Sequence, residues 1–153
     1  MTARSQLEFS TNVAAALAAL DSVAGGKGWC NVVPRVVEDV PDHKVNFGGL
    51  WVNKGVVEVS FVTAPPRHGQ VQPSTLGVLH TRGRLGRDRI ASLLDGANFA
   101  LLQDHNQRGL LLGVPAATPS SEVLDVMMSF GSALCDYEMT GIWRMDLYLR
   151  QSG

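Results

Sequence analysis

Charged side chains are scarce in this sequence of 153 residues. Asp, Glu, Lys and Arg make up 18% of it, against about a quarter in a typical globular protein. The 13 basic residues nearly balance the 14 acidic ones, so the formal net charge is −1. A general electrostatic binder of nucleic acid or acidic membrane is therefore not expected. With so few charges to cover its apolar surface, the chain is a candidate for self-association.

Long apolar runs are missing too. The longest covers residues 13–20, which is far below the roughly 20 residues that a membrane-spanning helix needs. Glu8 and Asp21 flank this run and only Arg4 precedes it, so the basic start of a signal peptide is absent. We therefore expect a cytoplasmic protein that does not contact a membrane.

The sequence is also poor in residues that commonly bind metals. Its two cysteines, Cys30 and Cys135, show no C-x-x-C spacing, and the four histidines are dispersed without any paired spacing. Two free thiols are the expected state, with one long-range disulfide as the alternative. No metal and no cofactor are predicted.

No local catalytic motif is present. A G-x-S-x-G elbow and a phosphate-binding P-loop are both missing, and residues 83–86 are one glycine short of a dinucleotide fingerprint. The pairs Asp42-His43 and Asp104-His105 fall where turns are expected, so they suggest polar turn chemistry. Asp136 and Glu138 beside Cys135 would raise the pKa of its thiol, which argues against a nucleophile. No catalytic residue is assigned, and enzymatic activity is not favoured.

Enough apolar residues are nevertheless present to build a core. The chain is 45% hydrophobic with a mean hydropathy of +0.06, and its length suits one domain spanning residues 1–153. No repeat or linker divides it.

The periodicity of apolar residues predicts the order of elements. Residues 6–23 predict an amphipathic helix with a small-residue second face, which Gly25-Gly26 ends. Residues 29–37 predict an edge or bulged strand because they contain Pro34. Further elements are a hairpin of 50–52 with 56–62, a loop over 64–74, a strand over 75–81, a helix over 87–95, a hairpin of 99–103 with 110–114, and a helix from Thr118 to about Thr140.

The last segment, residues 143–149, alternates apolar and polar side chains and predicts a closing strand, with a prolonged helix as the alternative. In the 56–62 strand, Glu58 and Ser60 are expected to face water. Hairpin-linked strands with few crossovers indicate the α+β class, in which helices pack on an antiparallel sheet in two layers. The order is helix, three or four strands, helix, two strands, helix and a final strand.

Charge is distributed unevenly along the chain. Residues 67–96 hold five arginines against two acids, and residues 97–150 hold three arginines against six acids. Four arginines and a histidine gather where a strand is expected to lead into a helix, and guanidinium groups at a helix N-terminus can hold a phosphate. The candidate anion-binding residues are His80, Arg82, Arg84, Arg87 and Arg89. The alternative is a solvated loop that pairs with the acidic C-terminal half, within one chain or across a dimer.

The segment SLLDGANFALLQDHNQRGLLLGVP, residues 92–115, resembles the centre of the type III secretion chaperone-like fold, which includes the class I effector chaperones and the YbjN-like family. In that fold a short helix is followed by a hairpin and then by a long helix. The predicted order of elements matches over most of residues 5–140.

The resemblance implies a small, non-enzymatic, homodimeric protein that binds an extended segment of another polypeptide on apolar patches. The aromatic residues that could form such patches are Trp29, Trp51, Phe61 and Trp143, although each could equally belong to an ordinary core. A small-molecule or phosphate-binding protein, and a subunit of a larger assembly, are the alternatives.

Overall fold

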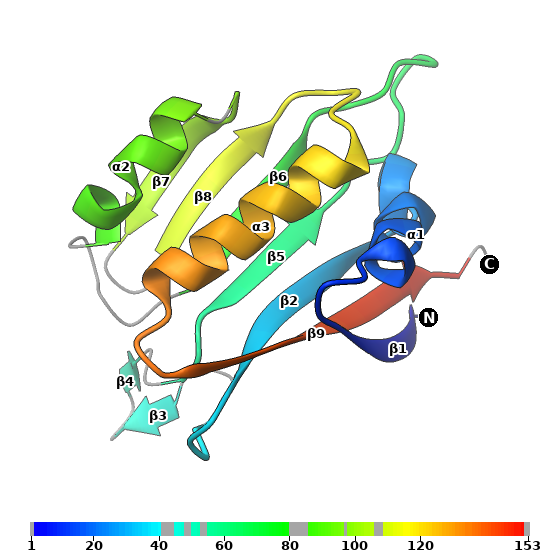
Figure 1. Cartoon of the computed structure of the whole chain (residues 1–153). Coiled ribbons are helices and arrows are strands. Elements are labelled where there is room, and N and C mark those ends of the chain that lie inside the picture. Colours follow the sequence, from blue (N-terminus) through cyan, green and yellow to red (C-terminus); the bar gives the residue numbers. More distant parts are fainter. Residues whose placement is uncertain are drawn as a thin grey trace.

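The computed structural model describes residues 2–40, 45–47, 50–52, 55–79, 86–96, 98–105 and 109–151. These form a seven-stranded antiparallel sheet, three α-helices and a separate pair of short strands (Figure 1). The elements are β1 (Thr2–Phe9), α1 (Ala14–Val23), the 3-10 turn η1 (Ala24–Gly26), β2 (Gly28–Val36), β3 (Val45–Phe47), β4 (Leu50–Val52), β5 (Glu58–Val62), β6 (Ser74–Leu79), α2 (Gly86–Gly96), β7 (Ala100–His105), β8 (Gly109–Val114), α3 (Ser120–Leu134) and β9 (Met139–Arg150).

The large sheet has the strand order β1-β9-β2-β5-β6-β8-β7. All three helices lie on one face of it (Figure 1). Helix α3 crosses the middle of the sheet over β2, β5 and β6, α1 packs on β1, β9 and β2, and α2 packs on α3 and β7. The α+β class and the two-layer arrangement of helices on an antiparallel sheet are thus confirmed.

The core lies between the sheet and the helices. Strand register aligns Met145, Val32, Val59, Val78 and Leu110 in one row across five strands, and all are almost inaccessible. The predicted helical face of α3 fills the other side of this core with Val123, Met127, Phe130 and Leu134, together with Leu124. Alternation in the strands and helical spacing in α3 therefore identified most of these apolar core residues, while Val126 and Ala133 of the same helical spacing are only half-buried.

Cys30 lies in the next row of the core, and both cysteines are free thiols as expected. Burial raises the pKa of the Cys30 thiol from 9.0 to about 12, although a backbone hydrogen bond at Phe61 opposes this effect. Above pH 9 the unfolded chain loses this proton while the folded chain keeps it. The free energy of unfolding should therefore fall as the pH rises from 9 towards 12, by up to about 1.4 kcal/mol per pH unit.

Urea unfolding of the wild type and Cys30→Ala at pH 8, 9 and 10 tests this expectation. The alanine variant lacks the thiol, so the difference in stability between the two proteins should narrow as the pH rises above 9. A constant difference over this range would contradict the assignment, because the other titrating groups are common to both proteins.

The prediction of one helix over residues 6–23 was wrong for its first part. Residues up to Phe9 form β1, and the helix begins at Ala14. Leu7 and Phe9 alternate with Gln6 and Glu8, and the whole strand pairs with β9. The backbone N–H and C=O groups of β1 thus have hydrogen-bond partners in β9, a strand far along the chain. This pairing favours the strand over a longer helix.

The predicted hairpin of 50–52 with 56–62 was also wrong. Strand β4 pairs with β3, whereas β5 pairs with β2 and β6. Glu58 is buried rather than wet, with an exposure of 5%, and Ser60 is half-buried. Strand β5 lies inside the sheet between β2 and β6, and the alternation along one strand did not show how far its polar side chains are covered by the rest of the chain.

Strand β2 is an interior strand and not an edge, but its predicted irregularity is present between Pro34 and Val36. Its pairing with β5 covers only Trp29 to Val32. Within the part of β2 that has neighbours on both sides, the missing N–H group of a proline would cost a hydrogen bond. Pro34 lies beyond that part.

Helix α3 ends at Leu134, earlier than predicted, and the chain then enters β9. The closing strand is confirmed, and the prolonged helix is wrong, because β9 hydrogen-bonds to β1 and β2 along most of its length. Thr118 is not the helix cap, since its hydroxyl donates to the carbonyl of Pro115 at 2.6 Å. The 64–74 loop, the α2 helix and the β7–β8 hairpin agree with expectation.

Candidate functional site

The sheet face opposite the helices, called the open face below, is the main candidate surface. No helix in the described part of the chain covers it (Figure 1). Strand register places one row of residues across it from edge to edge: Arg4, Tyr148, Trp29, Val62, Thr75, Gly113 and Ala100. The sequence could not show this surface, because its residues come from seven separate strands.

An aromatic pair occupies the open face where β2 meets β9. The rings of Trp29 and Tyr148 stack with centroids 5.1 Å apart and an interplanar angle of 9°. The Arg4 guanidinium lies 5.7 Å from the centre of the Tyr148 ring, and that of Arg150 lies 5.5 Å from the centre of the Trp29 ring. Each such cation–π contact at an exposed site contributes about 0.5–1 kcal/mol. Tyr148 and Arg150 thus contact the half-buried Trp29 ring directly, and Arg4 contacts the ring of Tyr148.

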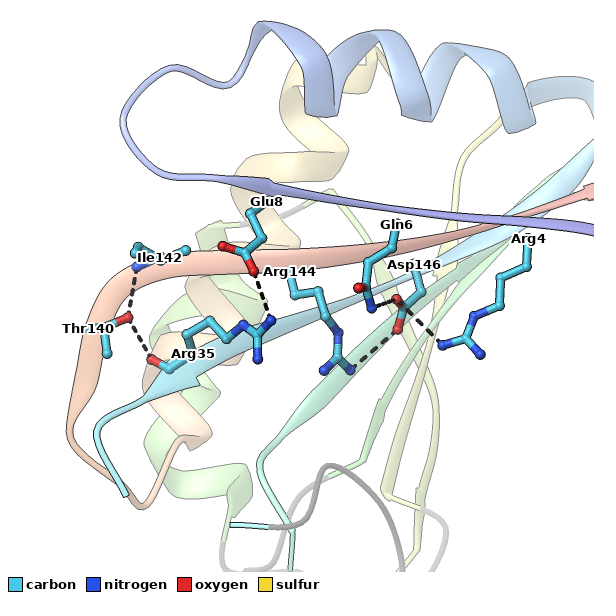
Figure 2. Close-up of polar contacts among 8 residues, drawn as sticks. All are labelled: Arg4, Gln6, Glu8, Arg35, Thr140, Ile142, Arg144 and Asp146. Carbon is cyan, nitrogen blue, oxygen red and sulfur yellow. Dashed lines mark hydrogen bonds and ion pairs between the residues drawn. The ribbon is translucent and has the colours of Figure 1, made fainter. Parts of the chain in front are cut away.

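A charged cluster lies beside this pair, centred on Asp146 (Figure 2). Gln6 donates from Nε2 to Asp146 Oδ1 at 2.7 Å, and Arg144 Nη2 lies 3.3 Å from Oδ2. The guanidinium of Arg4 approaches Oδ1 at 3.9 Å. The Asp146 side chain is only 3% exposed and that of Arg144 only 9%. Their charges are thus largely removed from water, and the contacts around Asp146 compensate for that loss.

A second ion pair on the same face is exposed. Arg35 Nη2 lies 2.8 Å from Glu8 Oε1, and both side chains are about half accessible. Thr140 donates to the Arg35 carbonyl at 3.1 Å and accepts from the Ile142 N–H at 3.2 Å (Figure 2). Strands β1, β9 and β2 are therefore joined on this face by side chains as well as by backbone hydrogen bonds.

The remaining strands of the open face carry apolar side chains and glycine. Val62 is 37% exposed and Leu102 is 58% exposed. Leu102 lies at the irregularity of β7 and leans over Gly113, with its Cδ1 atom 3.5 Å from where a Cβ of that residue would stand. Leu111 and Gly77 beside them are half-buried. This part of the open face offers apolar contact area without charge.

The helical side is hollowed in several places, among them the following two. A groove of about 260 Å³ between α2 and α3 is lined by Leu93, Val126 and Phe130, with Glu122 and Asp125 at its rim. A smaller cavity of about 140 Å³ lies among α1, the start of α3 and the 64–73 loop. Neither hollow gathers reactive groups, and the described residues contain no cluster of three or more His, Cys, Asp or Glu side chains able to hold a metal ion.

The structure separates the four aromatic residues that the sequence singled out. Trp29 lies on the open face, whereas Phe61 and Trp143 face the helices and are 7% and 4% exposed. Trp51 belongs to β4, and its side chain lies outside the described part. Sequence reasoning missed Tyr148, whose alternation with buried residues in the last strand was the available signal.

The predicted anion-binding residues are mostly beyond the described residues. His80, Arg82 and Arg84 lie outside them, and Arg87 and Arg89 are placed only as backbone in the first turns of α2. Asp42 and His43 also lie outside, whereas Asp104 and His105 end strand β7. The structure therefore brings no described side chains together at the arginine-rich junction.

Comparison with family models, with curated proteins and with solved structures finds no match for this chain. Among the described residues, no helix has the length and apolar character needed to cross a membrane.

Proposed function

We propose that this chain is a non-enzymatic, chaperone- or adaptor-like protein that binds an extended segment of a partner polypeptide on the open face. The observation that supports this most directly is the set of aromatic and aliphatic side chains on the open face, the half-buried Trp29 and the exposed Val62 and Leu102, where no described helix covers the sheet. Exposed apolar groups gathered on a rigid support are typical of protein-binding surfaces.

The chemistry of this surface favours one kind of partner. Trp29 stacks on Tyr148 and contacts Arg150, so an apolar side chain of a partner can pack against the accessible part of the ring with little loss of Trp29 rotamer freedom. Val62 opposes Trp29 across the strand pair, which continues the contact area into β5. A partner segment with apolar side chains at alternate positions would match this spacing.

The proposal includes a cytoplasmic location and a homodimeric state. Two free thiols, one buried and one half-buried, suit a reducing compartment. The apolar residues on the open face are also consistent with a subunit of a larger assembly, in which the same face would contact another subunit.

Selection from a random-peptide phage library on the immobilised protein tests the proposal. We expect enriched peptides with alternating apolar residues, whose binding is then measured by fluorescence anisotropy. Val62→Glu with Leu102→Glu should weaken this binding at least about tenfold, because two carboxylates would lose water on contact. Val71→Glu is the matched control, since Val71 is 59% exposed but lies in the 64–73 loop.

Two outcomes would refute the proposal. One is that no peptide is enriched over the uncoated support. The other is that the double variant binds the selected peptides as tightly as the wild type does. Binding lost only in Val71→Glu would move the site to the cavity beside α1.

A further inference from the structure

Strand β1 is an edge of the large sheet without the usual protection. All eight of its residues pair with β9 in one uninterrupted register, and no described residue pairs with its outer side. Proteins blunt such edges with charged side chains, above all lysine, or with proline or a bulge. Strand β1 has no lysine, proline or bulge, and its two charged residues, Arg4 and Glu8, are opposite in sign. The other edge, β7, is broken by an irregularity between Leu101 and Gln103. The two edges therefore differ, and β1 is the one able to accept another strand.

The sequence of β1 is complementary to itself when two copies run antiparallel. If Gln6 of one copy lies opposite the partner's Gln6, Arg4 lies opposite the partner's Glu8, and Glu8 opposite the partner's Arg4. Opposite charges directly across a strand pair are stabilising. Arg4 and Glu8 both project from the open face, where Arg4 contacts Asp146 and Glu8 contacts Arg35.

We propose that a second copy of this chain binds the β1 edge, with a twofold axis through Gln6, so that one continuous antiparallel sheet runs through both protomers. On the open face, each Arg4 joins Asp146 of its own chain to the partner's Glu8, which in turn contacts the partner's Arg35. The same row of charges is repeated on the other side of the axis, as an isologous interface requires.

The charges select this register among the alternatives. In the continuous sheet, the helices of both protomers lie on the same side only when residues opposite each other in the two β1 strands project from the same face. This condition is met when the twofold axis passes through a residue of β1. An axis through Arg4 would place two arginines opposite each other, and one through Glu8 would oppose two glutamates. These like-charge pairs are destabilising. Axes through Ser5 or Leu7 also keep each side chain on its own face, but they place Arg4 and Glu8 opposite uncharged residues. Among these axes, only the one through Gln6 pairs unlike charges at both positions.

The neighbouring helix leaves room for this approach. Helix α1 packs on β1, and its exposed residues include Ala14, Ala15 and Ala18. Its only charged residue is Asp21 in the last turn. No long charged side chain of α1 therefore stands against a second protomer at this edge.

The test uses charge reversal and mixing, with molar mass measured by light scattering after gel filtration at several concentrations. The wild type should have the mass of a dimer. Arg4→Glu and Glu8→Arg should each dissociate about 10- to 100-fold more readily, because each homodimer would then oppose two like charges twice. An equimolar mixture of the two variants restores unlike pairs at both positions, so it should regain the dimer.

Arg67→Glu and Glu38→Arg are the matched controls, since both residues are exposed and lie away from β1; they should remain dimeric. A second measurement fixes the register. Single cysteines at positions 4 to 8, in a Cys135→Ser background, should form an interchain disulfide readily only for Gln6→Cys. The proposal fails if the wild type is a monomer, if mixing restores nothing, or if another position cross-links best. The inference rests on the homodimeric state proposed above, but peptide binding on Val62 and Leu102 is a separate readout. A monomeric wild type would overturn the dimer and leave the peptide-binding proposal standing, whereas lost peptide binding would leave the dimer standing.

Discussion

Replacing Asp146 with alanine is expected to lower the free energy of unfolding by about 3–5 kcal/mol, the usual effect of breaking a buried charge pair. The Asp146 side chain is 3% exposed, and it contacts Gln6 and Arg144 on the open face. The variant would remove the carboxylate beside the buried Arg144 guanidinium, and it would also remove the acceptor for Gln6.

Chemical denaturation monitored by circular dichroism measures this loss. Arg35→Ala is the matched control, because Arg35 forms an ion pair of 2.8 Å with Glu8 on the same face but is 45% exposed, and it lies outside β1. An exposed pair of this kind contributes at most about 1 kcal/mol. Equal losses in the two variants would contradict the view that burial, rather than ion-pair geometry, determines the contribution of Asp146.

Trp143→Ala is the second change with a large expected effect, a loss of about 3–5 kcal/mol from the free energy of unfolding. Trp143 is 4% exposed and faces the helices. The tip of its ring lies against Gly131 of α3, where an added Cβ would stand 2.9 Å from Cη2 and Cζ3. The absence of a side chain at residue 131 thus makes the space that the indole ring fills.

Gly131→Ala provides the companion test, because its effect on the free energy of unfolding should change sign between the wild type and a Trp143→Leu background. In the wild type it is expected to destabilise by about 1–3 kcal/mol, since the rigid ring must move. With Trp143→Leu the space is free, and alanine should then stabilise the helix by up to about 1 kcal/mol relative to glycine. A destabilisation of the same size in both backgrounds would show that the ring and the glycine are not coupled.

Short-range patterns predicted much of this fold. The β7–β8 hairpin needs only neighbouring residues, and the core face of α3 follows from helical spacing alone. Residues 6–9 show why other segments were not predictable. Phe9 and Val13 stand at helical spacing, while Leu7 and Phe9 alternate as in a strand, so both structures fit locally. Pairing with β9, more than a hundred residues away, decides between them.

The candidate site depended on tertiary structure even more. Trp29, Phe61 and Trp143 are equivalent in the sequence as aromatic residues of expected strands, yet only Trp29 of these three lies on the open face. Which face of a strand the helices cover is a property of the assembled layers. The same holds for Arg144 and Asp146, which alternate with apolar residues in β9 and yet are buried.

The shortage of charge, the α+β class and most of the core were determined by the sequence itself, because composition and periodicity are local quantities. Tertiary structure decided that β1 is a strand at an open edge, that Asp146 joins Gln6 and Arg144, and that Trp29 stacks on Tyr148. Each of these depends on β9 reaching its place between β1 and β2. Pairing over such distances along the chain depends on the packing of the whole domain, which no local pattern contains.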